Sequence, residues 1–391
     1  MIPGIKAPAF TVLILCGFLF AQPRFSGYFE SELDQVRSRG TDYVFGYTKI
    51  RLDLEARPVE KAVLRANVNV QRFHGQERWD LFDFLPRRIT DPLIADGLTD
   101  FPFELPDTLY LDNVYLKVSF PAYDLTLGKQ QLSLGTGYAW NPLDIFNRKE
   151  LLDPSYEQTG VEAVRMEVPL ARRLLVDLIV APQGTWDQWT RLIRAKVGVG
   201  RFDLTATAGS FQWIRTGLDP ATYRNSPLVR NRTLVGWAAV GEWLNWGIWT
   251  EGGWNTMEED DPFLEVLLGV DHTFDFSTYL LMEAYHSGSA VSRKDRLQLD
   301  DYLSYFVGQT HSLMRDYLFL YVRHPFTDLL TAGLFGIANL NDDSTVFSPL
   351  LEYSLLENVI VSLLASGSRG DKDSEFGLQD WGLRLRVRAY Y

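Results

Sequence analysis

The sequence is almost free of cysteine. Its one cysteine, Cys16, lies in an apolar segment near the N-terminus that we expect to be removed from the mature protein. A chain without cysteine cannot form a disulfide, a thiolate metal site or a cysteine nucleophile. Composition therefore excludes these three kinds of site from the mature chain.

The sequence also lacks a basic excess, and it lacks a long hydrophobic run after its first 21 residues. The formal net charge of the 391 residues is −12, and the mean hydropathy is −0.10. Nucleic-acid-binding proteins normally carry a basic stripe, and a membrane-spanning helix needs roughly 20 mainly apolar residues. The composition therefore argues against a nucleic-acid partner and against a bundle of membrane helices.

Motifs for catalysis and cofactor binding are missing as well. None of the five histidines pair at the spacing of metal ligands, and the sequence has no His-Glu-x-x-His, phosphate loop, dinucleotide fingerprint or nucleophile elbow. We therefore expect no enzymatic activity, no cofactor and no metal. The weaker alternative is a hydrolase at the rim of a barrel, with His74, His286 and His311 near the ends of long loops.

The first 21 residues have the features of a signal peptide. Lys6 supplies the positive start, residues 9–20 form an apolar run too short to span a membrane, and Ala21 is suited to cleavage. We therefore divide the chain into a signal peptide, residues 1–21, and one mature domain, residues 22–391. Lipid attachment at Cys16 is the alternative, which the bulky Leu15 before it disfavours.

After residue 22 the dominant hydrophobic period is two, which indicates β-strands with one apolar and one polar face. In residues 43–54, for example, Ile50 and Leu52 alternate with Lys49 and Arg51. Residues 62–71 repeat this pattern. We predict that the apolar face of such strands contacts lipid, and we assign to it Val44, Ile50, Leu52, Leu64, Val68, Leu385 and Val387.

The connections between about 18 such segments alternate in length along the chain. Short turns such as residues 57–61, 121–123 and 200–201 alternate with long polar connections, the largest being residues 74–108 and 135–159. Short turns on one rim and long loops on the other are typical of outer-membrane barrels. We predict an all-β fold, a transmembrane antiparallel up-and-down β-barrel of about 18 strands. Sixteen strands, or a secreted sandwich or propeller, are the alternatives.

The end of the chain fits a barrel that is inserted into the outer membrane. Residues 382–391 alternate strictly between apolar and polar side chains and end on the aromatic Tyr391. The segment resembles the C-terminal signal by which outer-membrane barrels are recognised for insertion. The partners that we expect are therefore the barrel-assembly machinery, membrane lipid and lipopolysaccharide, and the expected location is the outer membrane of a Gram-negative-type bacterium.

One stretch of the sequence says more about family than the two-residue alternation does. Gly128-Lys-Gln130, Ser133 and Gly135 are followed by a loop with Asp144 and then by Ala163-Val-Arg165. This order resembles porins and alginate-export-type outer-membrane barrels over about 45 of the 391 residues, with Lys129 where arginine is commoner. The resemblance implies passive passage of a solute through a wide barrel, but it does not identify the solute.

Two sets of residues are candidates for the passage itself. In the long loop 135–159, which we expect to form a constriction, they are Trp140, Asp144 and Arg148; the aromatic-rich loop 74–108 is expected to fold into the lumen or over its mouth. On the polar strand faces the candidates share a positive charge: Lys49, Arg51, Arg65, Lys117, Lys129, Arg165, Arg384, Arg386 and Arg388.

These features predict a porin-like channel for passive diffusion of small hydrophilic solutes. If the last strand closes on the first, the three C-terminal arginines join a basic wall that favours anions. The alternative is a neutralised wall, in which they pair with carboxylates such as Glu30. Two further functions stay open: a substrate-specific exporter or importer of an acidic polysaccharide, and a plugged structural or adhesive barrel.

Overall fold

The computed structural model describes residues 23–98, 100–150, 157–217, 226–258 and 260–391. The predicted signal peptide, residues 1–21, lies outside the described residues. Among the helices of the described part, none is long and apolar enough to cross a membrane.

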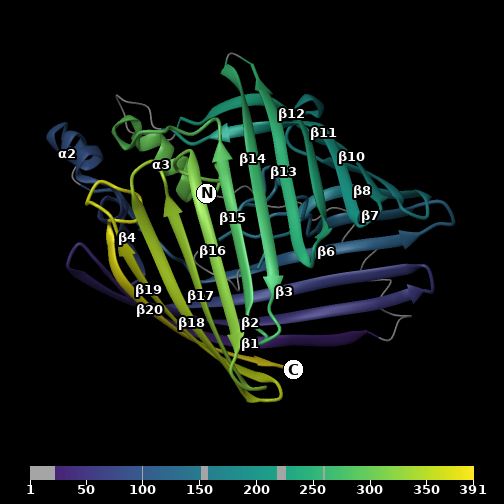
Figure 1. Cartoon of the computed structure of the whole chain (residues 1–391), viewed down its shortest axis with the longest axis horizontal. Coiled ribbons are helices and arrows are strands. Elements are labelled where there is room, and N and C mark those ends of the chain that lie inside the picture. The colour runs from purple at the N-terminus through teal and green to yellow at the C-terminus, as the bar shows by residue number, and fades with distance from the viewer. Residues whose placement is uncertain (1–22, 99, 151–156, 218–225, 259) are drawn as a thin grey trace.

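Within the described residues, eighteen strands form one antiparallel sheet that closes on itself (Figure 1). Each strand pairs with the next along the chain. The strands are β1 (Arg24–Ser38), β2 (Thr41–Val59), β3 (Ala62–Gly75), β6 (Thr108–Ser119), β7 (Asp124–Gln130), β8 (Val161–Ala171), β9 (Leu174–Ala181), β10 (Thr190–Val199), β11 (Phe202–Arg215), β12 (Leu228–Trp243), β13 (Trp246–Met257), β14 (Asp260–Thr273), β15 (Tyr279–Ser287), β16 (Asp316–Pro325), β17 (Leu330–Asn339), β18 (Ser344–Leu356), β19 (Val359–Arg369) and β20 (Gln379–Tyr390).

The barrel closes where the last strand pairs with the first. Tyr28 lies opposite Tyr390, and the register continues to Arg37 opposite Trp381. Closure satisfies the backbone groups that an open edge would leave unpaired in lipid. The prediction of an up-and-down barrel of about 18 strands is thus confirmed.

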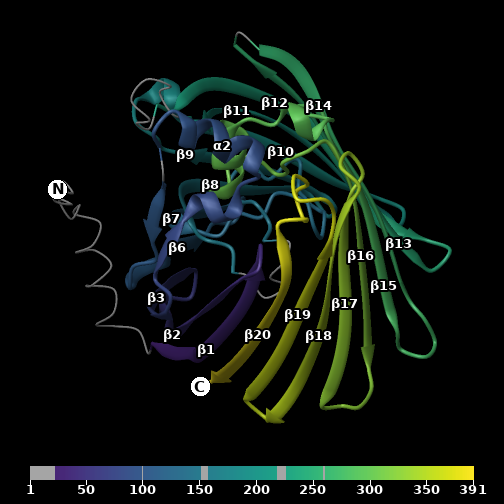
Figure 2. The same cartoon turned by 90° about the vertical axis from the view of Figure 1, so that its left-hand side faces the viewer.

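The two rims differ as the sequence predicts. At one rim, connections of two to five residues join the strands, as at 60–61, 244–245 and 274–278. The other rim carries the long connections, including 76–107, 131–160 and 288–315, together with three short ones. The C-terminal end of β20 lies at the short-turn rim, beside the turns that join β16 to β17 and β18 to β19 (Figure 2).

The outer face of the wall is apolar. Val44, Ile50, Leu52 and Leu385 are all 40% or more exposed there, as predicted for side chains that meet lipid. Leu64 lies on the same face, opposite Ala56 and Leu116 of the neighbouring strands, but is only 3% exposed.

The lumen has a packed side, formed by the inner face of β13–β19. Side chains of this wall, such as Trp249 and Phe319, pack against loops that fold inward from the long-loop rim. The loop 76–107 forms the hairpin β4 (Arg78–Asp80) and β5 (Pro102–Glu104), the turn η1 (Leu81–Phe84) and α2 (Arg87–Ala95). The loop 288–315 forms η3 (Lys294–Arg296) and α3 (Leu299–Phe306).

The prediction that the aromatic-rich loop folds into the lumen or over its mouth is supported, since Leu81, Phe82 and Leu85 join wall residues in one buried cluster. The two short helices were not predicted from the sequence. Helices of eight or nine residues have little stability of their own. Packing stabilises α3, which buries Tyr302 and Leu303, whereas α2 buries only Thr90 and packs Ile89 and Leu93 at the margin of the core cluster. A third short turn, η2 (Trp186–Gln188), lies in the loop between β9 and β10.

Candidate functional site

A polar cavity of about 760 Å³ lies inside the barrel beside β1–β3 and β6–β8. It extends from Arg24, at the start of β1 on the short-turn rim, to Arg51, midway along β2. Polar side chains such as Asn67 and Gln130 complete its lining. This polar side of the lumen lies opposite the packed side, so it offers the space that a hydrophilic solute needs.

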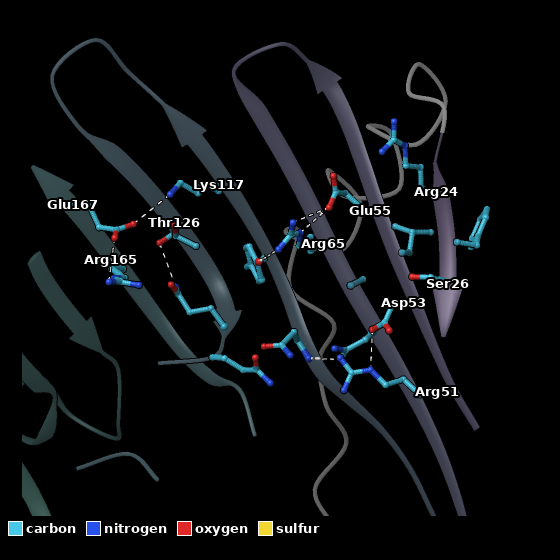
Figure 3. Close-up of a pocket in the computed structure, with 18 residues that line it drawn as sticks. Arg24, Ser26, Arg51, Asp53, Glu55, Arg65, Lys117, Thr126, Arg165 and Glu167 are labelled. Carbon is cyan, nitrogen blue, oxygen red and sulfur yellow. Dashed lines mark hydrogen bonds and ion pairs between the residues drawn. The ribbon is translucent and has the colours of Figure 1, made fainter. Parts of the chain in front are cut away.

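Basic and acidic side chains are paired along the cavity wall (Figure 3). Arg51 lies 2.9 Å from Asp53, and Arg65 lies 2.8 Å from Glu55. Glu167 of β8 lies 3.3 Å from Lys117 of β6 and 3.1 Å from Arg165 of its own strand. The lining has five cationic side chains and three carboxylates. Further carboxylates pair with the cations of the lining: Glu157 with Arg51, Asp124 with Lys117 and Asp177 with Arg165. Ion pairs therefore balance most of the positive charge, while Arg57 and Arg65 share one carboxylate, Glu55.

The three C-terminal arginines also line the lumen, but they do not form an unbalanced basic wall. Arg384 pairs with Asp34 at 2.7 Å, and Arg386 and Arg388 pair with Glu32 and Glu30 of β1. The register of β20 against β1 causes this pairing, since it places each arginine opposite one carboxylate. The neutralised-wall alternative therefore describes this part of the barrel.

Lys129 lies on the outer face, so its prediction as a pore-wall residue is wrong. Thr126 and Gln130, on the other face of β7, are the residues that line the cavity. Lys129 donates a hydrogen bond of 2.7 Å to the carbonyl of Leu111. A lysine on an outer face can keep its charge near polar groups while its stem covers apolar surface.

The described part of the predicted constriction loop, residues 131–149, folds into the lumen. Trp140 is 2% exposed and stacks on Tyr285 of the wall, with ring centroids 5.2 Å apart. Asp144 is buried and accepts hydrogen bonds from the backbone N–H groups of Leu134, Phe146 and Asn147. The predicted constriction residues are thus placed inside the barrel.

Arg148 joins this segment to α3. Its guanidinium lies 4.5 Å from the ring centroid of Tyr305 and donates to the Tyr305 carbonyl. Two of the inward loops are therefore connected to each other as well as to the wall.

Two wall carboxylates that sequence reasoning did not assign to this role hold the loop in place. Glu251 of β13 accepts from the backbone N–H groups of Thr136 and Leu143, the latter at 2.6 Å. Glu283 of β15 accepts from those of Tyr138 and Ala139, the latter at 2.6 Å. We call Glu251 and Glu283 the latch carboxylates. Their place on the inner face was the only sequence signal, because backbone donors leave no residue pattern.

Small residues in the loop and in the wall make this close fit sterically allowed. A Cβ at Gly137 would lie 1.9 Å from the Trp140 carbonyl oxygen and 2.4 Å from Leu267 of the wall. A Cβ at Gly236 of β12 would lie 2.3 Å from Leu143 of the loop. Only glycine at these positions allows the loop to approach the wall so closely.

His311 connects the loop 288–315 to the wall and to the loop 131–149. Its ring nitrogens lie 3.4 Å from a carboxylate oxygen of Glu265 and 3.2 Å from the carbonyl oxygen of Asp144. Both partner atoms are acceptors, so the doubly protonated imidazolium suits this place best. Burial lowers the pKa of His311, but the hydrogen bond and charge of Glu265 outweigh it and raise that pKa above its usual value.

We predict that this contact makes stability pH-dependent. A raised pKa in the folded state gives a contribution that is fully present below pH ~6.5 and is lost as the pH rises through the folded pKa. The free energy of unfolding of the wild-type protein should therefore fall by about 1–2 kcal/mol as the pH rises through the folded pKa of His311. The free energy of unfolding of H311Q should change less with pH. Thermal unfolding in detergent from acid to mildly alkaline pH tests this, with H74Q at the rim as control. A parallel profile for H311Q would contradict the assignment.

The other two histidines of the rim-hydrolase alternative do not join His311. His74 contacts Thr48 at 3.0 Å, while His286 pairs with Asp316 at 2.7 Å. His74 and His286 are exposed, whereas His311 is enclosed by Glu265 and the loops. In the part of the chain that the structure describes, no three His, Cys, Asp or Glu side chains gather as a metal site would require.

Comparisons with known proteins give a fold and no more. No family model and no curated protein matches the chain. Solved structures match it at about one-tenth sequence identity. Acinetobacter baumannii OccAB4 is 11% identical, with 95% of this chain and 98% of that one covered and a TM-score of 0.54. The outer membrane protein OprD from Pseudomonas aeruginosa is 7% identical, with coverages of 94% and 93% and a TM-score of 0.54.

A third structure, Pseudomonas aeruginosa OccK2 in complex with glucuronate, is 10% identical, with coverages of 94% and 98% and a TM-score of 0.53. The chain therefore shares the barrel fold of these outer-membrane porins. This supports the porin part of the resemblance found in the sequence, at the level of fold. The alginate-export part stays a prediction.

Proposed function

We propose that this protein is an outer-membrane channel through which small hydrophilic solutes diffuse passively. The observation that carries the proposal is the polar cavity of about 760 Å³, enclosed by a barrel whose outer face is apolar. Side chains of the cavity wall can replace part of the hydration shell of a solute as it passes. The chain's own residues bind and orient the solute, and no chemical step is involved.

The two arginines that share one carboxylate, Arg57 and Arg65 on Glu55, support a modest preference for anions. Charges beside a low-dielectric wall focus the field in the passage and raise the local concentration of counter-ions. Of these two, Arg65 belongs to the cavity lining, whereas the lining cation Lys117 is balanced by Asp124 and Glu167. The C-terminal arginines contribute little, because Glu30, Glu32 and Asp34 balance them.

The proposed location is the outer membrane of a Gram-negative-type bacterium, with lipid and lipopolysaccharide around the apolar outer face. Pairing of β20 with β1 supports a role of the C-terminal strand in insertion by the barrel-assembly machinery. A plugged structural or adhesive barrel is the second candidate, and the buried loop 131–149 is the observation that favours it. Transport of an acidic polysaccharide has weaker support, since three inward loops narrow the lumen.

Recordings in planar bilayers test the proposed function. Refolded full-length protein should give discrete conductance steps, and a tenfold KCl gradient should shift the reversal potential toward that of chloride. Folding is checked independently by gel electrophoresis, in which a folded barrel changes its mobility after the sample is heated. Correctly folded protein without conductance would support the plugged barrel, whereas a cation-selective channel would contradict the anion preference.

A further inference from the structure

The carboxylate of Glu157 occupies an unusual position inside the barrel. Glu157 belongs to the connection 131–160, and it lies beside the inner faces of β1 and β2. One of its oxygens accepts a hydrogen bond of 2.8 Å from the Tyr28 hydroxyl. The other accepts from Lys49 at 3.0 Å and from Arg51 at 2.9 Å. Three donors from the wall thus converge on one carboxylate supplied by a loop.

The donors on the wall side of this contact are held in place by other residues of the wall. Arg388 of β20 and Lys49 both lie over the Tyr28 ring, at 4.6 and 5.5 Å from its centroid. Arg51 is also held by Asp53 at 2.9 Å. The donors therefore come from strands that are fixed by the barrel's hydrogen-bond register, and packing and ion pairing hold their side chains in place.

Glu157 carries its charge in this place. Burial raises the pKa of the Glu157 carboxyl, but the charges and hydrogen bonds of Lys49, Tyr28 and Arg51 outweigh it and hold that pKa below its usual value. A carboxylate that accepts bonds from a lysine, an arginine and a tyrosine has the environment of a bound anionic ligand.

The contact also lies at one end of the polar cavity. Arg51 is part of the cavity lining, at the end away from the short-turn rim. Beyond it along β1 follow Glu30, Glu32 and Asp34, each already paired with an arginine of β20. Lys49 pairs here with Glu157 of the loop, and Arg51 pairs with Glu157 as well as with Asp53 of the wall.

We propose that Glu157 is a tethered occupant of a carboxylate-binding site formed by Tyr28, Lys49 and Arg51, and that a solute carboxylate enters the site by exchanging with it. This inference rests on the proposed channel function. In this arrangement Glu157 is a specificity-determining residue: it keeps the site filled and neutral in the absence of solute. The exchange is reversible and conserves charge, because one carboxylate replaces another on the same donors.

The variant E157Q tests the exchange. Glutamine keeps the shape of the side chain but has no charge, and it directs an amide N–H₂ toward cationic donors. Acetate should therefore bind E157Q about tenfold more tightly than wild type, the scale of one charge-assisted hydrogen bond. Acetate should also block the chloride current of E157Q in a saturable manner, and uncharged acetamide should not.

Matched variants separate this effect from a general change of charge. E167Q removes one carboxylate from the same cavity lining, so it should shift the reversal potential without strengthening acetate binding. Adding K49Q and R51Q to E157Q should abolish the gain in acetate affinity. Equal acetate affinity in E157Q, E167Q and wild type would overturn the inference.

The failure of this inference can be told apart from failure of the channel function. Binding of isotope-labelled acetate to each refolded variant, followed in detergent by NMR line broadening, does not depend on conductance. If wild type conducts but E157Q binds acetate no more tightly than wild type, only the role of Glu157 as a tethered occupant is refuted. If E157Q binds acetate more tightly but no variant conducts, the channel function is refuted and the carboxylate site is retained.

Discussion

Replacing both latch carboxylates, in the variant E251Q/E283Q, should widen the channel and lower its thermal stability. Both oxygens of each carboxylate accept hydrogen bonds, and the donors include four backbone N–H groups of residues 136–143. Glutamine directs an amide N–H₂ at some of these donors and leaves them unsatisfied. Each buried unsatisfied donor costs about 1–3 kcal/mol, so the loop should leave its place.

Single-channel recordings should show a larger and noisier conductance for this double variant than for wild type, and heat should unfold it at lower temperature. D271N is the matched control, because Asp271 also faces the lumen but accepts a hydrogen bond from Tyr279 of the wall and none from the loop. Unchanged conductance in E251Q/E283Q, together with a lower unfolding temperature, would mean that the loop does not limit the passage.

A second large loss of stability is expected from a charged substitution on the outer face. The variant I50R places a charge at the middle of β2, where Ile50 is 48% exposed on the apolar surface. An arginine near the bilayer midplane costs a barrel roughly 2–4 kcal/mol. Unfolding by denaturant in lipid vesicles measures this cost.

Q71R is the control for I50R. Gln71 pairs with Lys49 on the inner face of the neighbouring strand, so arginine there meets the lumen and not lipid. A cost for I50R no larger than for Q71R would show that the face near Ile50 does not meet the hydrocarbon core.

The fold was predictable from the sequence because barrels repeat two simple patterns. Alternation of residues such as Ile50 and Leu52 with Lys49 and Arg51 predicts the two faces, and the alternating length of connections predicts the two rims. Lys129 shows where this reasoning fails. Near the end of a strand a cation can lie on either face, because its long side chain reaches polar groups from both.

The candidate site was predictable only in part, because its contacts depend on register and on loops. Alternation predicts that Arg384, Arg386 and Arg388 share a face, but their neutral balance depends on the pairing of β20 with β1. Trp140 and Asp144 were assigned to a constriction from their loop alone. The partners that hold the loop, Glu251 and Glu283, bind backbone N–H groups, which every residue except proline has.

The ladder that closes the barrel has a consequence for folding. Tyr28 pairs with Tyr390, so the first and last strands meet only when almost the whole chain is available. Contacts between residues so far apart in sequence form slowly, because a long loop must close before they form. Until that moment two strand edges stay unpaired and prone to aggregation. The inward loops must also reach the interior before or during this last pairing, so closure of the ladder is the step that an assembly factor would most need to protect.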